Sequence, residues 1–191
     1  MSDVEAVTQL VLRERQARDR GWWEWMDECY RHDSAVGLSW FGGSGPDYVE
    51  RCRELAADGV QTTHHTCAPA VRVNGDRAFA EAPTSVQLRA VVSGVHVDLV
   101  SHARLVYRLM HDDEWAVLSL HAVHERDSLA AAHPGDTAPA LPGSAEQRPS
   151  HARLARVLRE LGRPVADDVL GDDRPAEVDA FYLGVLSWLG I

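Results

Sequence analysis

Residues 71–125 read VRVNGDRAFAEAPTSVQLRAVVSGVHVDLVSHARLVYRLMHDDEWAVLSLHAVHE. Three reversal signals, Asn74-Gly75, Ser93-Gly94 and Asp112-Asp113, divide this stretch into long segments with an alternating hydrophobic pattern. A period of two is typical of strands that bury one face. The stretch therefore predicts an antiparallel meander of four long strands. Pro83 should occupy a bulge or an edge, because it lacks an amide donor.

The residues before the meander show a helical period instead. Ser2 and Glu5 form a capping-box pattern ahead of apolar residues at helical spacing, so a first helix begins here. Residues 22–32 predict a second, aromatic-rich helix, residues 35–40 a short strand, and residues 44–59 a third helix. We therefore expect an α+β fold in which three N-terminal helices pack on one face of a curved antiparallel sheet.

The chain changes character after residue 127. Residues 128–149 are rich in alanine, proline and glycine, and they predict a linker between a core domain of residues 1–127 and a helical extension of residues 150–191. The extension holds an amphipathic helix over residues 154–161 and a last helix, after Asp173, that is apolar around most of its circumference. We expect that last helix to dock on the core domain or on a partner subunit.

The composition indicates a globular protein and restricts the classes of molecule that it can bind. Of the 191 residues 45% are hydrophobic and 25% charged, and no window approaches the roughly 18 consecutive apolar residues of a membrane span. All 19 basic residues are arginine, which excludes lysine Schiff-base chemistry and a lysine-dependent phosphate loop. The net charge of -10 argues against nucleic acids and anionic membranes as partners.

Cysteine and histidine spacing argues against a metal site. The three cysteines show no CxxC spacing, which indicates reduced thiols, and no HxH or HExxH pattern occurs, so we expect no metal site. The N-terminus MSDVEAVTQL lacks a basic region followed by an apolar core. No signal peptide is therefore predicted, and the expected location is the cytoplasm.

One strand of the meander carries histidine, aspartate and arginine on a single face. His96, Asp98, His102 and Arg104 share one parity along residues 95–110, whereas the other parity is apolar. Such a face either meets solvent or a partner subunit, or it lines a wet pocket. The chemistry favours the pocket, because these residue types serve proton transfer and oxyanion stabilisation.

Several short motifs occur in an order that a known family shows. They are Asp19-Arg20-Gly21-Trp22-Trp23, Asp33 to Trp40, Thr63-His64-His65, the Asn74-Gly75-Asp76 turn and Glu114-Trp115-Ala116-Val117. Through them, residues 4–127 resemble the SnoaL-like and scytalone-dehydratase-like branch of the nuclear transport factor 2-like superfamily. The resemblance implies a cone-shaped α+β barrel with a deep cavity and a homodimer formed through the outer sheet face. It also implies acid–base chemistry without cofactors, although the family contains non-enzymes.

The resemblance implies functional residues position by position. Asp19 falls on a helix-borne catalytic aspartate that orients a histidine, and His65 falls on the acid–base histidine. His102 and Arg104 fall where relatives place polar residues that face the substrate. If Asp19 accepts from His65 Nδ1–H, it fixes the tautomer, raises the pKa of the imidazole and leaves Nε2 to shuttle a proton.

His64 and His65 are adjacent, so in an extended segment they point to opposite faces. We expect His65 in the cavity and His64 at the surface. The alternative is that His65 is an ordinary hydrogen-bonded core residue.

The leading hypothesis is a cofactor-independent dehydratase, isomerase or cyclase that acts on a polyketide- or terpenoid-like carbonyl compound. His65, oriented by Asp19, moves a proton next to the carbonyl, and His102 and Arg104 hydrogen-bond the developing enolate or alkoxide. A pocket for a hydrophobic, oxygenated molecule combines aromatic walls with few polar groups. The substrate-binding residues that we expect are Trp23, Trp40, Asp98, Arg104 and His121.

Two other functions stay open. Arg18 and Trp40 stand where the fungal dehydratases of this branch have catalytic tyrosines, which favours a non-catalytic small-molecule-binding or dimerisation module of the same fold. The third function is a small structural subunit beside an oxygenase, as in other cone-fold relatives. Turnover would indicate the enzyme, and retention of an unchanged metabolite would indicate the binding module. Co-purification with a larger metal-bearing chain would indicate the structural subunit.

Overall fold

The structure, a computed structural model, describes residues 1–59, 62–140, 148–166 and 168–191. The helices are α1 (Asp3–Arg20), α2 (Trp23–Asp27), α3 (Gly45–Ala57), α4 (Ala152–Glu160) and α5 (Pro175–Leu189). The strands are β1 (Tyr30–Leu38), β2 (Phe41–Ser44), β3 (Thr62–Thr66), β4 (Ala70–Asn74), β5 (Arg77–Val92), β6 (Val95–His111) and β7 (Trp115–Ala131).

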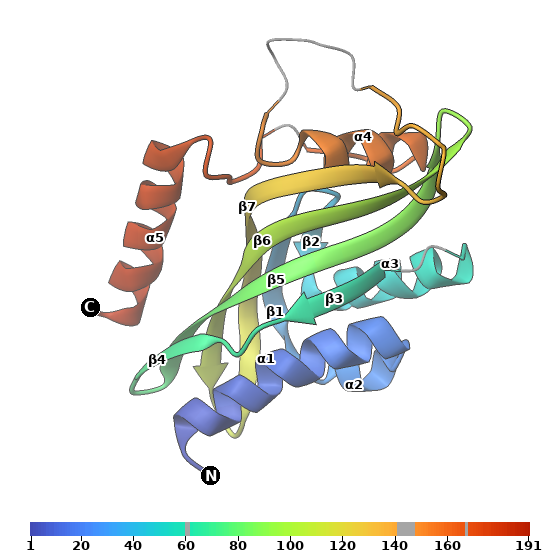
Figure 1. Ribbon diagram of the computed structural model, residues 1–191. Helices are drawn as coiled ribbons and strands as arrows, with labels where there is room; N and C mark the ends of the chain where they lie inside the picture. Colours follow the sequence, from blue (N-terminus) through green and yellow to red (C-terminus); the bar gives the residue numbers. More distant parts are fainter. Residues whose placement is uncertain (60–61, 141–147, 167) are drawn as a thin grey trace.

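One curved sheet organises the molecule. Its strands follow the order β2-β1-β7-β6-β5-β3, and β4 pairs with the other end of β5. The pairs are antiparallel apart from β1 and β7, which run parallel. The sheet curves around α1 and α3 without closing (Figure 1). The predicted α+β fold, with a curved sheet on three N-terminal helices, is confirmed, and the cone is open.

The first and third helices begin where their caps predict. The Ser2 hydroxyl accepts from the Glu5 amide at 3.3 Å and the Glu5 carboxylate accepts from the Ser2 amide at 2.8 Å, which completes the capping box of α1. At the start of α3 the Ser44 hydroxyl accepts from the Asp47 amide at 3.2 Å. Both helices lie on the inner face of the sheet, where their apolar sides contribute to the main core.

Residues 22–32 do not form the single helix that their aromatic content predicts. α2 covers only five residues, and the chain then extends into β1. β1 pairs with β7 from Tyr30 onward, and the gain from this pairing outweighs local helix propensity.

The meander forms as predicted, and Pro83 lies within β5 at a gap between two partner strands. β4 pairs with residues 77–81 of β5, and β3 pairs with residues 84–88. The Pro83 carbonyl accepts from the Cys67 amide at 2.9 Å, so its ring nitrogen faces the same edge. Because the ladder is interrupted at this edge, the missing amide donor leaves no partner unpaired.

Two bulges in β7 change which of its side chains face the helices. Register shifts against β6 leave an extra residue in β7 at Leu118 and at Glu125. One extra residue reverses the alternation of a strand. Leu120 and His124 therefore face the interior of the cone, whereas His121 faces outward.

The C-terminal helices cover opposite faces of the sheet (Figure 1). Leu154, Val157 and Leu158 of α4 pack on the inner face near the turn between β5 and β6. α5 packs on the outer face, where Val178 and Val185 form a second cluster with side chains of β5, β6 and β7. The predicted C-terminal helices are thus docked on the core domain.

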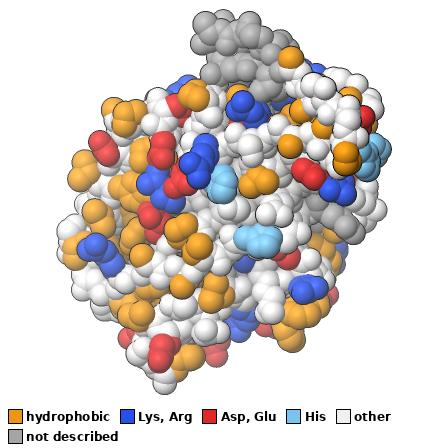
Figure 2. All heavy atoms as spheres, viewed as in Figure 1, with side chains coloured by type: hydrophobic (Ala, Val, Ile, Leu, Met, Phe, Trp, Pro, Cys, Tyr) orange, Lys and Arg blue, Asp and Glu red, His pale blue; other side chains and the backbone are white. Residues whose placement is uncertain are grey.

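The boundary after the core domain lies slightly later than expected. β7 continues to Ala131, four residues past residue 127. Residues 141–147 of the predicted linker lie outside the described residues. Charged and histidine side chains are interspersed with apolar ones over the face shown in Figure 2. Within the described ranges, no helix is both long and apolar enough to cross a membrane.

Candidate active site

An interior cavity lies between α1, α3 and the inner face of the sheet, and its volume is about 100 Å³. Its apolar wall includes Leu88 of β5, while α4 adds Leu154 and Leu158, so the C-terminal extension forms part of the cavity wall. The polar side chains on the wall are Arg15, Arg18, Ser39, Tyr48, Thr62, His64, Ser101, His124 and Arg163. Three arginines without an aspartate or glutamate among the described lining residues make this wall positive.

His64 is the histidine of β3 that reaches this cavity. Its ring Nδ1 lies 2.5 Å from Asp19 Oδ1, and its backbone amide donates to Asp19 Oδ2 at 2.7 Å. The expectation that His65 lies in the cavity beside Asp19 is wrong, because His65 is exposed on the other face of β3. β3 pairs His64 with Val86 of β5, and Val86 faces the cavity, so the register turns His64 inward.

Asp19 fixes the tautomer of His64. A carboxylate acceptor at Nδ1 requires a proton there, so Nε2 of the neutral ring keeps its lone pair. Burial lowers the pKa of His64, and the charges of Arg15 and Arg18 also lower it. The expected rise of the imidazole pKa is thus reversed, since burial outweighs the opposing effect of Asp19. His64 is neutral near pH 7, the state that a general base needs.

A buried network of charged and phenolic groups lies next to the cavity. Glu14 and Arg15 form a buried ion pair, and the carboxylate accepts from the hydroxyls of Tyr30 at 2.9 Å and Tyr107 at 3.1 Å. Arg15 Nη2 donates to the Tyr48 hydroxyl at 3.2 Å. Burial raises the pKa of Tyr48, so this phenol keeps its proton, and Tyr48 is one of the residues that line the cavity.

Other polar atoms on the cavity wall have no partner. Arg18 Nε, Arg163 Nε and both ring nitrogens of His124 are buried and make no hydrogen bond with the residues that the structure describes. Burial lowers the pKa of His124 to about 4, so its ring is neutral near pH 7. Among the described residues, no group of three or more histidine, cysteine or carboxylate side chains is placed to hold a metal ion.

β6 turns its polar face away from the cavity. Ser101, Ala103 and Leu105 line the cavity, so His102 and Arg104, which have the opposite parity, lie on the outer face. The expectation that this face forms a wet pocket is wrong. Burial of the apolar parity against the helices provides the larger gain, and the polar parity is left on the outer side of the sheet.

The polar residues of β6 have partners on that outer surface. Asp98 accepts from Arg89 Nε at 2.6 Å, and His102 Nδ1 lies 2.9 Å from the Ser85 hydroxyl. His96 is exposed. None of these three residues of β6 is among the described residues that line the cavity.

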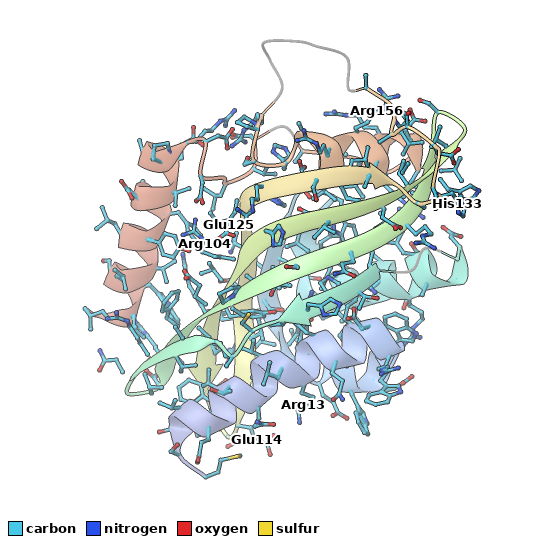
Figure 3. All side chains as sticks on the ribbon, in the orientation of Figure 1. Arg13, Arg104, Glu114, Glu125, His133 and Arg156 are labelled. Carbon is cyan, nitrogen blue, oxygen red and sulfur yellow. The ribbon has the colours of Figure 1, made fainter. Side chains whose placement is uncertain are left out.

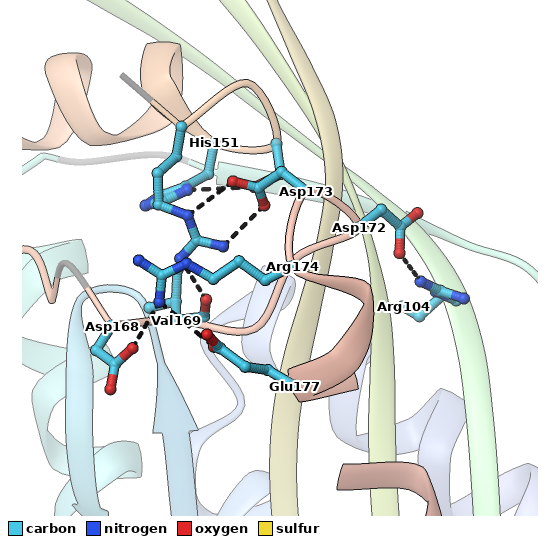
Figure 4. A network of polar contacts seen from close by, with 10 residues as sticks. Arg104, His151, Asp168, Val169, Asp172, Asp173, Arg174 and Glu177 are labelled. Atoms are coloured by element: carbon cyan, nitrogen blue, oxygen red, sulfur yellow. Dashed lines mark hydrogen bonds and ion pairs between the residues drawn. The ribbon is translucent and has the colours of Figure 1, made fainter. Parts of the chain in front are cut away.

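Arg104 contacts the C-terminal segment and not the cavity. Its Nε lies 3.4 Å from Glu125 Oε1 of β7. Both residues are labelled in Figure 3. Arg104 also forms an ion pair with Asp172, which precedes α5 (Figure 4). Beside it, Arg148 donates to both carboxylate oxygens of Asp173, at 2.8 and 2.7 Å. This network ties the segment before α5 to the sheet.

Of the aromatic and histidine residues expected to bind substrate, only Trp40 lines the cavity. Trp23 packs against Gly21 and the edge of the main core. His121 faces a separate outer groove of about 510 Å³, with its ring 5.4 Å from that of Phe181, because the bulge at Leu118 reverses its parity. Trp40 lines both spaces, as do Leu38, Ser39 and Ala122.

Fold and sequence define the class of this protein. Residues 1–121 match the SnoaL-like domain, which is well over half of the 191 residues. The chain belongs to the SnoaL-like family. No curated protein sequence matches it.

Solved structures share its fold at low sequence identity. A type 2 hexachlorocyclohexane dehydrochlorinase superposes with a TM-score of 0.59 and 14% identity over 69% of this chain and 94% of that one. A putative scytalone dehydratase from Novosphingobium aromaticivorans superposes with a TM-score of 0.54 and 15% identity, over 75% of this chain and 100% of that one. A Mycobacterium tuberculosis protein of unknown function superposes with a TM-score of 0.54 and 19% identity, over 65% of this chain and 72% of that one. These likenesses establish the fold of the scytalone-dehydratase-like branch.

Proposed function

We propose that this SnoaL-like protein is a cofactor-independent acid–base enzyme, a lyase or isomerase, that removes a proton next to a carbonyl group. The Asp19–His64 pair carries this proposal, because it holds a neutral histidine at the wall of an interior cavity. A positioned base of this kind contributes about 10²–10⁴-fold to proton transfer. The dyad proposed from the sequence is thereby retained, with His64 in place of His65.

The negative charge that develops on the carbonyl oxygen needs a hydrogen-bond donor. We assign this role to Tyr48 in place of His102 and Arg104. Tyr48 lines the cavity and its phenol is protonated, and its oxygen already accepts from Arg15, which makes the hydroxyl a stronger donor. One well-placed donor of this kind contributes about 10²–10³-fold.

The fate of the proton on His64 Nε2 decides between the two reaction types. Return of the proton to a different carbon gives an isomer, whereas its delivery to a β-hydroxyl group releases water and leaves a carbon–carbon double bond. Two structural neighbours are named as a dehydratase and a dehydrochlorinase, and both names describe eliminations. This likeness supports the lyase.

We propose a hydrophobic, oxygenated carbonyl compound of the polyketide or terpenoid type as the substrate class. Apolar side chains such as Leu88 and Leu154 together with the ring of Trp40 suit such a molecule. An engineered cavity of about 150 Å³ binds benzene, whereas this one has about 100 Å³. A substrate of this class therefore requires α4 to move aside when it binds.

Metabolite profiling of the source strain tests the proposal. Deletion of the gene should cause an intermediate to accumulate. The wild-type gene and the His65→Gln variant should clear that intermediate, whereas the His64→Gln and Asp19→Asn variants should not. Tyr48→Phe should slow its conversion by about 10²-fold.

The matched pair of histidine variants separates the outcomes. Equal clearance by folded His64→Gln and wild-type protein would overturn the catalytic assignment. Tight retention of the intermediate by the purified wild-type protein, without chemical change, would show a binding module instead.

A further inference from the structure

The cavity wall carries more positive charge than proton transfer by His64 requires. The chain has a net charge of -10, yet Arg15, Arg18 and Arg163 all line this cavity, and its described lining holds no acidic side chain. Glu14 neutralises Arg15, and Asp58 lies 3.4 Å from Arg163. Arg18 is left without a counter-charge.

Arg18 is buried at the end of α1, where it is 6% exposed. Among the described residues it makes no hydrogen bond and no ion pair, and its Nε is buried without a partner. An isolated charge in a protein interior is strongly unfavourable. Arginine does not relieve this by losing its proton. The unpaired charge indicates that an anion completes the site.

Two further groups with unpartnered polar atoms face the same space. His124 of β7 is 4% exposed, and neither of its ring nitrogens has a partner in the described part of the chain. A neutral imidazole still has one N–H to donate. Arg163 Nε is likewise unpartnered, and it comes from the segment after α4, outside the residues that match the family.

We propose that the ligand of this cavity is a small carboxylate, whose anionic group pairs with Arg18 and whose apolar body lies against the leucine-rich wall of β5 and α4. A guanidinium matches a carboxylate with two parallel N–H donors. The inference deepens the proposed function by assigning a carboxylate to the substrate. Only the statement that the ligand is a substrate rests on the proposed function, because binding of a carboxylate requires no turnover.

The volume of the cavity sets the size of the probe. The cavity of about 100 Å³ is smaller than the roughly 150 Å³ that binds benzene, so it must widen slightly even for a compact branched acid. Isobutyrate is the probe, and isobutyramide has the same shape without the charge. Inorganic phosphate supplies an anion without an apolar body. The three probes separate the contributions of charge and of apolar contact.

NMR titration of the full chain tests the proposal. Isobutyrate should shift the Arg18 Nε–H resonance saturably, and isobutyramide and phosphate should each bind at least about 10-fold more weakly. Arg18→Met should abolish isobutyrate binding. Arg20→Met removes an exposed charge from the same end of α1 and should bind isobutyrate as the wild type does.

A melting experiment adds a signature that a merely structural arginine does not produce. Arg18→Met should raise the Tm of the ligand-free protein, because it removes an unpaired buried charge. The same variant should lose the rise in Tm that isobutyrate gives the wild type.

The outcomes distinguish this proposal from the catalytic one. Equal affinity for isobutyrate and isobutyramide, or unchanged isobutyrate binding in Arg18→Met, would overturn the carboxylate site. Phosphate binding as tight as that of isobutyrate would overturn the apolar half of the proposal. His64→Gln should lose turnover and keep isobutyrate binding, so a failed base and a failed anion site give different results.

Discussion

His124 shows what burial does to a single ionisable side chain. It is almost fully buried on the inner face of β7, and burial lowers its pKa from the ordinary value of 6.5 to about 4. In the unfolded chain the ring titrates near its ordinary value. The unfolded state therefore binds a proton first as the pH falls, and the free energy of unfolding decreases between pH 6.5 and 4.

This residue predicts a loss of stability in mild acid. Between pH 7 and pH 5 we expect His124 alone to lower the free energy of unfolding by about 2 kcal/mol. His64 and His151, whose pKa values burial also lowers, add to the decrease. Urea unfolding at the two pH values measures it.

The variant His124→Phe should remove that part of the pH dependence, and His96→Gln, at an exposed position, should keep it. A wild-type protein that is equally stable at pH 7 and pH 5 would contradict the assignment.

The choice between His64 and His65 shows the limit of sequence reasoning at this scale. Adjacency shows that the two rings point apart, but not which one points inward. That depends on the pairing of His64 with Val86 of β5, a long-range register. For Glu14 and Arg18 the sequence does indicate burial, because both lie at the helical spacing of the apolar face of α1.

At the scale of elements, periodicity predicts the helices and the meander but not the irregularities within them. The capping box fixes α1 and the turn signals fix β5, β6 and β7. The bulge at Leu118 leaves no mark in the pattern of alternation, yet it moves His121 outward and His124 inward. A helix expected over residues 22–32 gives way to β1 for a similar reason, since strand pairing is decided elsewhere in the chain.

The docking of α5 gives a prediction at the same scale. Val185 is fully buried between this helix and the outer face of the sheet, whereas Leu183 on the same helix is 68% exposed. Val185→Asp buries a carboxylate in an apolar contact, so we expect α5 to detach and to expose Phe79, Val106 and Val123. The detached form should self-associate, which light scattering detects as a mass that rises with concentration.

Leu183→Asp is the matched control, because the same substitution on the solvent side of α5 should leave the mass and the protease resistance of the C-terminus unchanged. The docking interpretation fails if Val185→Asp and Leu183→Asp behave alike.

At the scale of the whole molecule, the C-terminal extension alters both faces of a SnoaL-like cone. Residues 1–121 match the family, but α4 forms part of the cavity wall and the segment after it supplies Arg163. α5 covers part of the outer sheet face through which the resemblance implies dimerisation. A homodimer remains a proposal, and over this part of the sheet a second subunit would contact α5.

The fold was predictable as a whole because it follows from local patterns that agree with one another. The site was predictable only in part, because its charged wall is assembled from α1, β3, β7 and the segment after α4. Asp19, which contacts His64, and Trp40, which lines the cavity, were both named from the sequence, whereas Tyr48 and Arg163 join the cavity wall only through tertiary packing.

The measurement that addresses the proposed mechanism most directly is the nitrogen NMR spectrum of the His64 ring as a function of pH. We predict a neutral ring at pH 7 with the proton on Nδ1 and a titration midpoint below 6.5, and Asp19→Asn should disturb that tautomer. A His64 ring that is protonated at pH 7, or neutral with its proton on Nε2, would contradict the assignment of His64 as the base.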